Sequence, residues 1–301
     1  MTPVNESSRP LWRQGLDRLR RWQSARTLSI SDDPEPTLER PVSQAATASQ
    51  CDDPIYIRWC DVIREEPKLH RKQWEFVYVL QALEVRGMLA EGRRGLGFGV
   101  GREPLVAALA ARGCALLATD LEPDNPAVEN WRASGEYGGA KGTLNGRGIC
   151  PPDTFDANVE FAFADMRDPS TIPGSFDFLW SSCALEHLGS LAAGFDFLRA
   201  SLALLRPGGV AVHTTEYNVS SDAETVEDGP VVLYRRRDLL QLRDELRALG
   251  YELELNFNTG STPSDLHIDI WPYDSPRHLK MLHTRFATTS IGLTITRASP
   301  S

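Results

Sequence analysis

The segment LGFGVGREPLVAALAARG, residues 96–113, is the feature that most limits the possible folds of this chain. It reads as a short apolar strand, a turn with three alternating glycines, and a helix of small apolar residues. Glycine permits positive φ and a close approach to the main chain, and the helix that follows directs free N–H groups at the turn. Structural glycines in an ordinary turn are the alternative interpretation. The segment predicts a strand–turn–helix unit.

Short apolar strands alternate with amphipathic helices along most of the chain. Strands are expected at 94–98, 115–119, 160–164, 176–181, 209–214, 252–256 and 290–296. Helices are expected at 71–89, 103–112, 124–134, 191–205 and 236–249. This alternation predicts an α/β fold with a doubly wound, mostly parallel, Rossmann-like sheet of seven strands.

Three regions are expected. Residues 1–28 form a basic amphipathic helix, whose 9–26 stretch could make a weak peripheral membrane contact or be a frayed terminal helix. Residues 29–54 are poor in large apolar side chains, which predicts a disordered linker. Residues 55–301 form the main domain, with a polar and aromatic insertion at about 258–286.

Composition excludes several classes of protein. A formal net charge of −9 argues against a nucleic-acid surface, which needs an excess of Lys and Arg. Five scattered cysteines without a CxxC pair fit neither a disulfide framework nor a zinc site. No apolar run is long enough to span a membrane, so a soluble, cytoplasmic protein is expected. Composition does not predict an oligomeric state.

Acidic residues follow the second and third predicted strands. Asp120 ends CALLATD, nineteen residues after Gly101, where a carboxylate can accept both ribose hydroxyls of a nucleoside. Asp165 and Met166 follow VEFAF, where an acid can bind the adenine amino group and an apolar side chain can cover the ring. A simple strand-end turn is the alternative for Asp165.

The order GFGVG, TD, ADM, FDFLWSS and LRPGG resembles the class I S-adenosylmethionine (SAM)-dependent methyltransferase family, from about residue 70 to 297. The strings WSSCALEHLGSL, PGGVAVHTTEYN, LYRRRDL and TTSIGL resemble a bacterial group presumed to act in glycan or cell-surface biosynthesis. The resemblance implies a last strand inserted antiparallel and SAM as the cofactor.

The resemblance also implies a set of cofactor-binding residues. Phe98 stands where the family often has an acid, so Glu75 on the preceding helix is the candidate for the methionine amino group. The full expected set is Glu75, Gly97, Phe98, Gly99, Gly101, Asp120, Leu121, Asp165, Met166 and Ser181.

The acceptor side is expected at the ends of the fourth and fifth strands. Methyl transfer needs an aligned nucleophile, and an alcohol also needs a base. His187 is the first candidate because its ordinary pKa lies near neutrality, and Glu216 is the second. His187 as a capping residue and His213 as a packed core histidine are the alternatives to catalytic and substrate-binding roles.

The insertion is the expected place of acceptor recognition, because a connection leaving the carboxyl end of a strand lies over the active-site edge. The expected substrate-binding residues are His213, Tyr234, His267, Asp269, Trp271 and Tyr273. The arginines at 235–237 could attract an anionic acceptor. The candidate ligands have no metal-binding spacing, so no metal is expected.

These features together predict a methyltransferase that acts on a small polar acceptor, most simply a saccharide hydroxyl. A protein or N-methyltransferase and a catalytically silent SAM-binding module are the alternatives.

Overall fold

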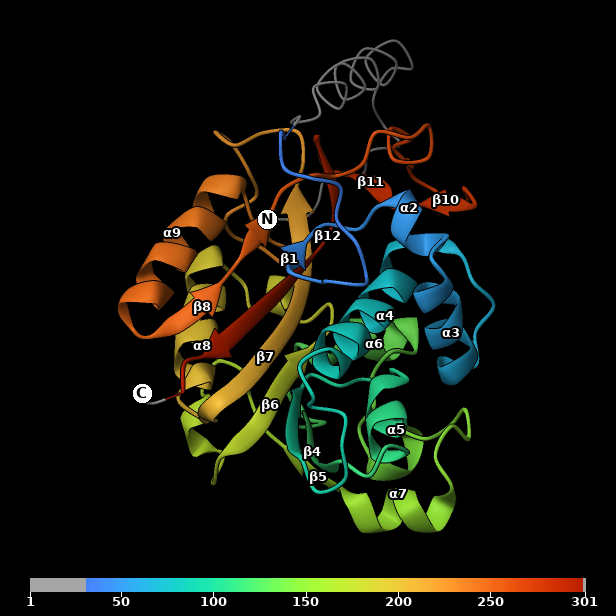
Figure 1. Ribbon diagram of the computed structural model, residues 1–301, viewed down its shortest axis with the longest axis vertical. Helices are drawn as coiled ribbons and strands as arrows, with labels where there is room; N and C mark the ends of the chain where they lie inside the picture. Colours follow the sequence, from blue (N-terminus) through green and yellow to red (C-terminus); the bar gives the residue numbers. More distant parts are fainter. Residues whose placement is uncertain (1–30, 300–301) are drawn as a thin grey trace.

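The computed structural model describes residues 31–299, so the predicted helix at 1–28 and its membrane contact lie outside the described residues. A central sheet has the strand order β11-β12-β7-β6-β3-β4-β5, and β8 also pairs with β12 (Figure 1). The strands are β3 (Arg94–Phe98), β4 (Ala115–Asp120), β5 (Val159–Phe163), β6 (Phe176–Ser181), β7 (Leu205–Asn218), β8 (Tyr251–Leu253), β11 (Lys280–His283) and β12 (Phe286–Arg297).

Five strands from β5 to β7 are parallel, and β12 is antiparallel to β7. The α/β fold and the antiparallel last strand are confirmed. The sheet has eight strands where seven were expected, because the insertion contributes β11 to the end of β12 that β8 leaves free.

Helices cover both faces of the sheet, as expected of a doubly wound fold (Figure 1). Alternate residues of β6 face opposite layers, with Phe178 and Trp180 in one core and Leu179 in the other. The first core contains residues of α3 (Pro54–Ile63), α4 (Arg71–Glu84), α5 (Leu105–Ala110) and α7 (Pro152–Asn158), and the second contains residues of α8 (Leu191–Leu202) and α9 (Arg236–Ala248). The helix α6 (Val128–Ser134) follows β4.

The prediction of a disordered linker is wrong for residues 31–54. They form β1 (Ser43–Gln44) and α2 (Ala48–Cys51), and β1 pairs with β9 (Leu255–Asn256). The Ser43 hydroxyl accepts a hydrogen bond from the Thr294 amide at 2.9 Å. Small polar side chains that bond to the main chain of the sheet hold this segment, a stabilisation that a count of apolar residues does not detect.

The insertion is ordered by short strand pairings. After β9, the chain forms β10 (Arg277–His278), which pairs in parallel with β2 (Leu69–His70), and then β11. Lys280 is fully buried and donates to the carbonyl oxygens of Thr259 and Asp265. The insertion is therefore fixed both to β12 and to the segment just before α4.

Candidate active site

A cavity of about 500 Å³ opens at the carboxyl ends of β3, β4 and β6. This is the edge where open α/β sheets bind ligands. Its wall includes seven of the residues predicted from the sequence: Gly99, Gly101, Asp120, Leu121, Asp165, Met166 and His187. The remaining predicted residues lie elsewhere.

The glycine turn contributes two of its three glycines to the cavity. Gly99 has φ 56° and Gly101 has φ 49°, conformations that favour glycine. Gly97 and Phe98 end β3 and are not in the cavity wall, so the structure does not support their assignment to cofactor contact. A Cβ on Gly97 would lie 2.3 Å from Trp180 Cζ2, and Phe98 packs edge-on against Phe197.

Asp120 ends β4 with a nearly buried carboxylate. Its Oδ1 accepts the Leu121 amide at 2.8 Å, while Oδ2 is buried and accepts no well-formed hydrogen bond. The amides of Gly101, Gly138 and Gly139 lie near enough to the carboxylate to oppose the effect of burial on its pKa. Burial raises the pKa of this carboxyl above its ordinary value. An unpaired buried oxygen is costly, and ribose hydroxyls would supply the missing donors. The residues present therefore fit a nucleoside.

Asp165 and Met166 lie along the same wall. Arg167 makes a two-pronged contact with Asp165, with Nη2 at 2.6 Å from Oδ2, and this bonding lowers the pKa of the carboxyl. Met166 is buried, and its sulfur would lie 3.4 Å from a Cβ placed on Gly99. An apolar surface thus adjoins the glycine turn.

Glu75 is not in the cavity wall, so its expected contact with the methionine amino group was wrong. The side chain is fully buried and accepts hydrogen bonds from Cys183 Sγ at 3.0 and 2.9 Å. The hydroxyls of Thr214 and Ser290 also donate to it. The Glu75 carboxylate thus accepts its hydrogen bonds from other residues of the protein and not from a ligand in the cavity.

His187 lies in the cavity wall and has a defined tautomer. Its Nδ1 is 2.8 Å from the carbonyl oxygen of Pro230, a contact that requires the proton on Nδ1. Its ring packs edge-on against Trp131 with centroids 5.6 Å apart. Burial lowers the pKa of the imidazole, so the ring is neutral at pH 7 with a free lone pair on Nε2.

Glu216 is held away from the cavity, so its assignment as a catalytic group was wrong. Arg71 Nη1 lies 2.5 Å from Glu216 Oε1, and Thr288 Oγ1 donates to Oε2 at 2.8 Å. The strand β7 continues to Asn218, so Glu216 lies within the sheet rather than at its edge. Glu186 completes a buried group of three carboxylates with Glu75 and Glu216.

Three further predicted residues are core residues. His213 is fully buried, its Nδ1 lies 2.8 Å from Ser181 Oγ, and its ring packs against Phe197. Tyr234 is also fully buried, with its ring against Phe195. Ligand contacts predicted for His213, Ser181 and Tyr234 were therefore wrong. The residue that reaches the cavity from the end of β6 is Ser182.

The insertion residues lie outside the cavity wall, contrary to the prediction. Asp269 accepts from His278 Nδ1 at 2.6 Å, and Tyr273 donates to the Leu282 carbonyl at 2.7 Å. His267 contacts Ser275, while Trp271 is 76% exposed. Strand pairing directs these side chains into the insertion itself or into solvent. His278 meets the cavity only indirectly, through a ring contact of 4.8 Å with the lining residue His70.

Several lining residues were not predicted from the sequence, chiefly from the segment after α6 and the start of α4. They include Lys72, Glu103, Trp131, Glu136 and Tyr137. The aromatic Trp131 on the helix after Asp120 and the acid two residues after Gly101 were the available signals.

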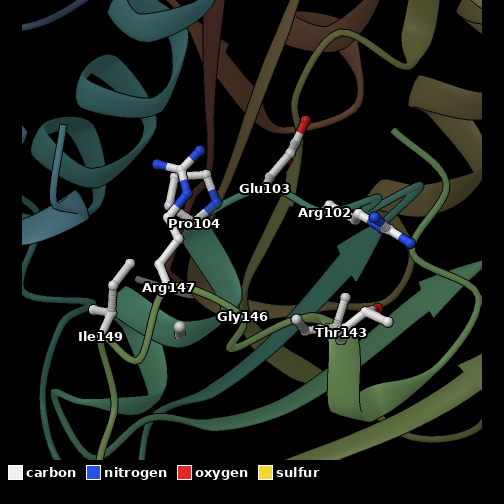
Figure 2. Close-up of a pocket in the computed structure, with 9 residues that line it drawn as sticks. Arg102, Glu103, Pro104, Thr143, Gly146, Arg147 and Ile149 are labelled. Atoms are coloured by element: carbon white, nitrogen blue, oxygen red, sulfur yellow. The ribbon is translucent and has the colours of Figure 1, made fainter. Parts of the chain in front are cut away.

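A second cavity of about 350 Å³ adjoins the first and shares Arg102, Glu103 and Arg147 with it. Figure 2 shows the Glu103 side chain extending away from Thr143 and Gly146 on the opposite wall of this second cavity. Arg147 is bound to Glu65 at 2.5 Å. Glu103 therefore lines both cavities, with its carboxylate directed away from the Thr143 side of the smaller one (Figure 2).

Within residues 31–299, no cluster of three His, Cys, Asp or Glu side chains is arranged to hold a metal ion. No helix in that range is long and apolar enough to cross a membrane.

Neither a protein-family model nor a curated protein matches this chain. Among solved structures, it is similar to TehB from Haemophilus influenzae, at 14% identity and a TM-score of 0.46 over 73% of this chain and 61% of that one. It is also similar to a magnesium protoporphyrin IX methyltransferase from Synechocystis PCC 6803 with bound SAH, at 13% identity and a TM-score of 0.46 over 81% and 94%. A third is the CcbJ methyltransferase from Streptomyces caelestis, at 14% identity and a TM-score of 0.41 over 72% and 93%. The present chain thus spans less than two thirds of TehB. The fold assignment rests on the strand order given above.

Proposed function

We propose that this protein is a SAM-dependent methyltransferase acting on a small polar acceptor, most simply a saccharide hydroxyl. The observation that carries the proposal is the unpaired, buried Oδ2 of Asp120 in a cavity bounded by the glycine turn. The motif order quoted above supports methyl transfer over other nucleotide chemistry.

The cofactor half of the cavity is formed by residues at three strand ends. Bound SAM would supply an electrophilic methyl group on a positively charged sulfur. Asp120 would accept the ribose hydroxyls, Met166 would cover the adenine, and Gly99 and Gly101 would admit the ligand to the main chain. Leu121 adds a further apolar contact.

On the acceptor side, His187 would act as the general base. Because its Nδ1 donates to Pro230, Nε2 can accept a proton from an acceptor hydroxyl. The neutral imidazole is available at pH 7 because burial lowers its pKa. Trp131, in contact with His187, offers an aromatic face that would suit a sugar ring.

The test is incubation of the full chain with isotopically labelled SAM and a panel of glycans, followed by mass spectrometry. The proposal predicts a labelled methyl group on an oxygen of one glycan class. Label found only on nitrogen or on protein would overturn the hydroxyl acceptor. If SAM binds and no acceptor of any class is labelled, the protein is a silent SAM-binding module.

A further inference from the structure

Glu103 has a buried carboxylate oxygen without a partner, next to the proposed cofactor site. Oε2 is buried and accepts no well-formed hydrogen bond, although the Ser182 hydroxyl lies close enough to lower the pKa of the carboxyl. The side chain lines the main cavity together with Gly99, Gly101 and Ser182. Within residues 31–299, seven buried side-chain polar atoms lack a partner, and three of these are in this cavity: Glu103 Oε2, Asp120 Oδ2 and Ser182 Oγ. The clustering indicates that a ligand completes their hydrogen bonding.

The chemistry of these atoms restricts the group that can bind. A carboxylate oxygen needs a donor, and a serine hydroxyl can donate or accept. A protonated amine offers several N–H donors and a positive charge, which a buried carboxylate binds more strongly than a neutral donor. The other acidic candidate, Glu75, is already saturated by Cys183 and the two hydroxyls described above.

We infer that Glu103, with Ser182 beside it, binds the α-amino group of the cofactor's amino-acid part. This inference rests on the proposed function, because it assumes that SAM or its demethylated product SAH occupies the cavity. Glu103 follows Gly101 by two residues and lines the cavity with Gly99 and Gly101, the glycines beside which the amino-acid part would lie. It assigns to Glu103 the contact that the sequence suggested for Glu75.

The inference also predicts that Glu103 changes its protonation state when the ligand binds. Burial raises the pKa of Glu103 well above its ordinary value, so the carboxyl favours its neutral form when no ligand cation is bound. A bound ammonium favours the ionised form, and Glu103 then releases its proton. Lys72, Glu75 and Asp120 are the charged neighbours that also act on this carboxyl. Ligand binding is therefore coupled to proton release.

The experiment compares SAH with 5′-methylthioadenosine, which has the same nucleoside and thioether but no amino-acid part. Calorimetry would measure both affinities for the natural protein, Glu103→Gln and the control Glu84→Gln, whose carboxylate lies outside both cavities and is paired with Arg58. We expect Glu103→Gln to reduce the preference for SAH at least about tenfold, the value of one charge-assisted hydrogen bond. The affinity of Glu103→Gln for methylthioadenosine and the preference in Glu84→Gln should be unchanged.

Repeating the titrations in two buffers of different ionisation enthalpy gives the number of protons released. The natural protein should release more protons with SAH than with methylthioadenosine, and Glu103→Gln should lose this excess. Equal preference for SAH in the natural protein and Glu103→Gln would overturn the inference while leaving the proposed function intact. Failure of the natural protein to bind either ligand would instead overturn the proposed function.

Discussion

His187 Nδ1 donates a hydrogen bond to the carbonyl oxygen of Pro230 at 2.8 Å, which leaves Nε2, 4.0 Å from Glu186 Oε1, as the proton-accepting nitrogen. The contact fixes both the tautomer and the orientation of the ring. A base whose tautomer and orientation are fixed in this way should contribute strongly to turnover and little to cofactor binding. We therefore expect His187→Ala to lower kcat by about 10²- to 10⁴-fold, the usual contribution of a general base, with the Kd for SAH unchanged. Unchanged turnover would remove His187 from the chemistry.

The pH dependence of turnover should reflect the same group. Burial lowers the pKa of His187 below its ordinary value of 6.5, so the imidazole remains a neutral base to lower pH than a free histidine. As the pH falls through this lowered pKa, Nε2 becomes protonated and kcat should decline with one proton. A pH–rate profile of kcat checks this, and a limb clearly above 6.5 would indicate a different base.

Glu186 predicts a pH dependence of folding stability. Burial, with repulsion from Glu216 and Glu75, raises its pKa from 4.5 to about 8. Between these values the unfolded chain is ionised at Glu186 while the folded protein keeps its proton. The free energy of unfolding must therefore fall as the pH rises from about 5 to 8. Urea titrations should show this slope, and Glu186→Gln should reduce it, while Glu103, whose pKa burial also raises, contributes the part that remains. An unchanged slope in Glu186→Gln would contradict the prediction.

Arg71 is the counter-charge of the buried carboxylates and should be essential for stability. Its Nη1 contacts Glu216 at 2.5 Å and Glu75 at 3.5 Å. Replacing Arg71 by Met leaves both carboxylates without this cation, which costs about 3–5 kcal/mol of unfolding free energy when a buried pair is broken. Chemical denaturation would measure the loss. A loss below about 1 kcal/mol would show that the pair is dispensable.

Gly97 should be required for packing rather than for ligand binding. An added Cβ would lie 2.3 Å from Trp180 Cζ2 and 2.7 Å from Val100 Cγ1. Gly97→Ala should therefore destabilise the protein by about 1–3 kcal/mol, as overpacked cores do. Gly142→Ala is the matched control, because a Cβ there meets no atom within 4 Å. Equal melting temperatures for the two variants would contradict the packing role.

The fold was more predictable from the sequence than the site. The apolar runs at 94–98 and 176–181 coincide with β3 and β6, because a buried parallel strand leaves a continuous signal between turn residues. The strand-end acid Asp120 was placed in the cavity for the same reason. Its ligand remains a prediction.

The errors arose where side-chain direction or distant partners decide the outcome. Ser181 is the last residue of β6 and faces the core, whereas Ser182, one residue beyond the end of the strand, lines the cavity. Glu216 is neutralised by Arg71 from α4, a pairing that only the tertiary fold reveals. Spacing along the chain contains neither kind of information.

The proposed SAM-binding function depends most directly on Asp120 and its unpaired oxygen. Calorimetric titration of SAH into the natural protein and Asp120→Asn tests this function. We expect the natural protein to bind SAH and the variant to bind it at least about tenfold more weakly, because one charge-assisted hydrogen bond to the ribose is lost. Absence of binding by the natural protein at millimolar SAH, or equal affinity of the two proteins, would contradict it.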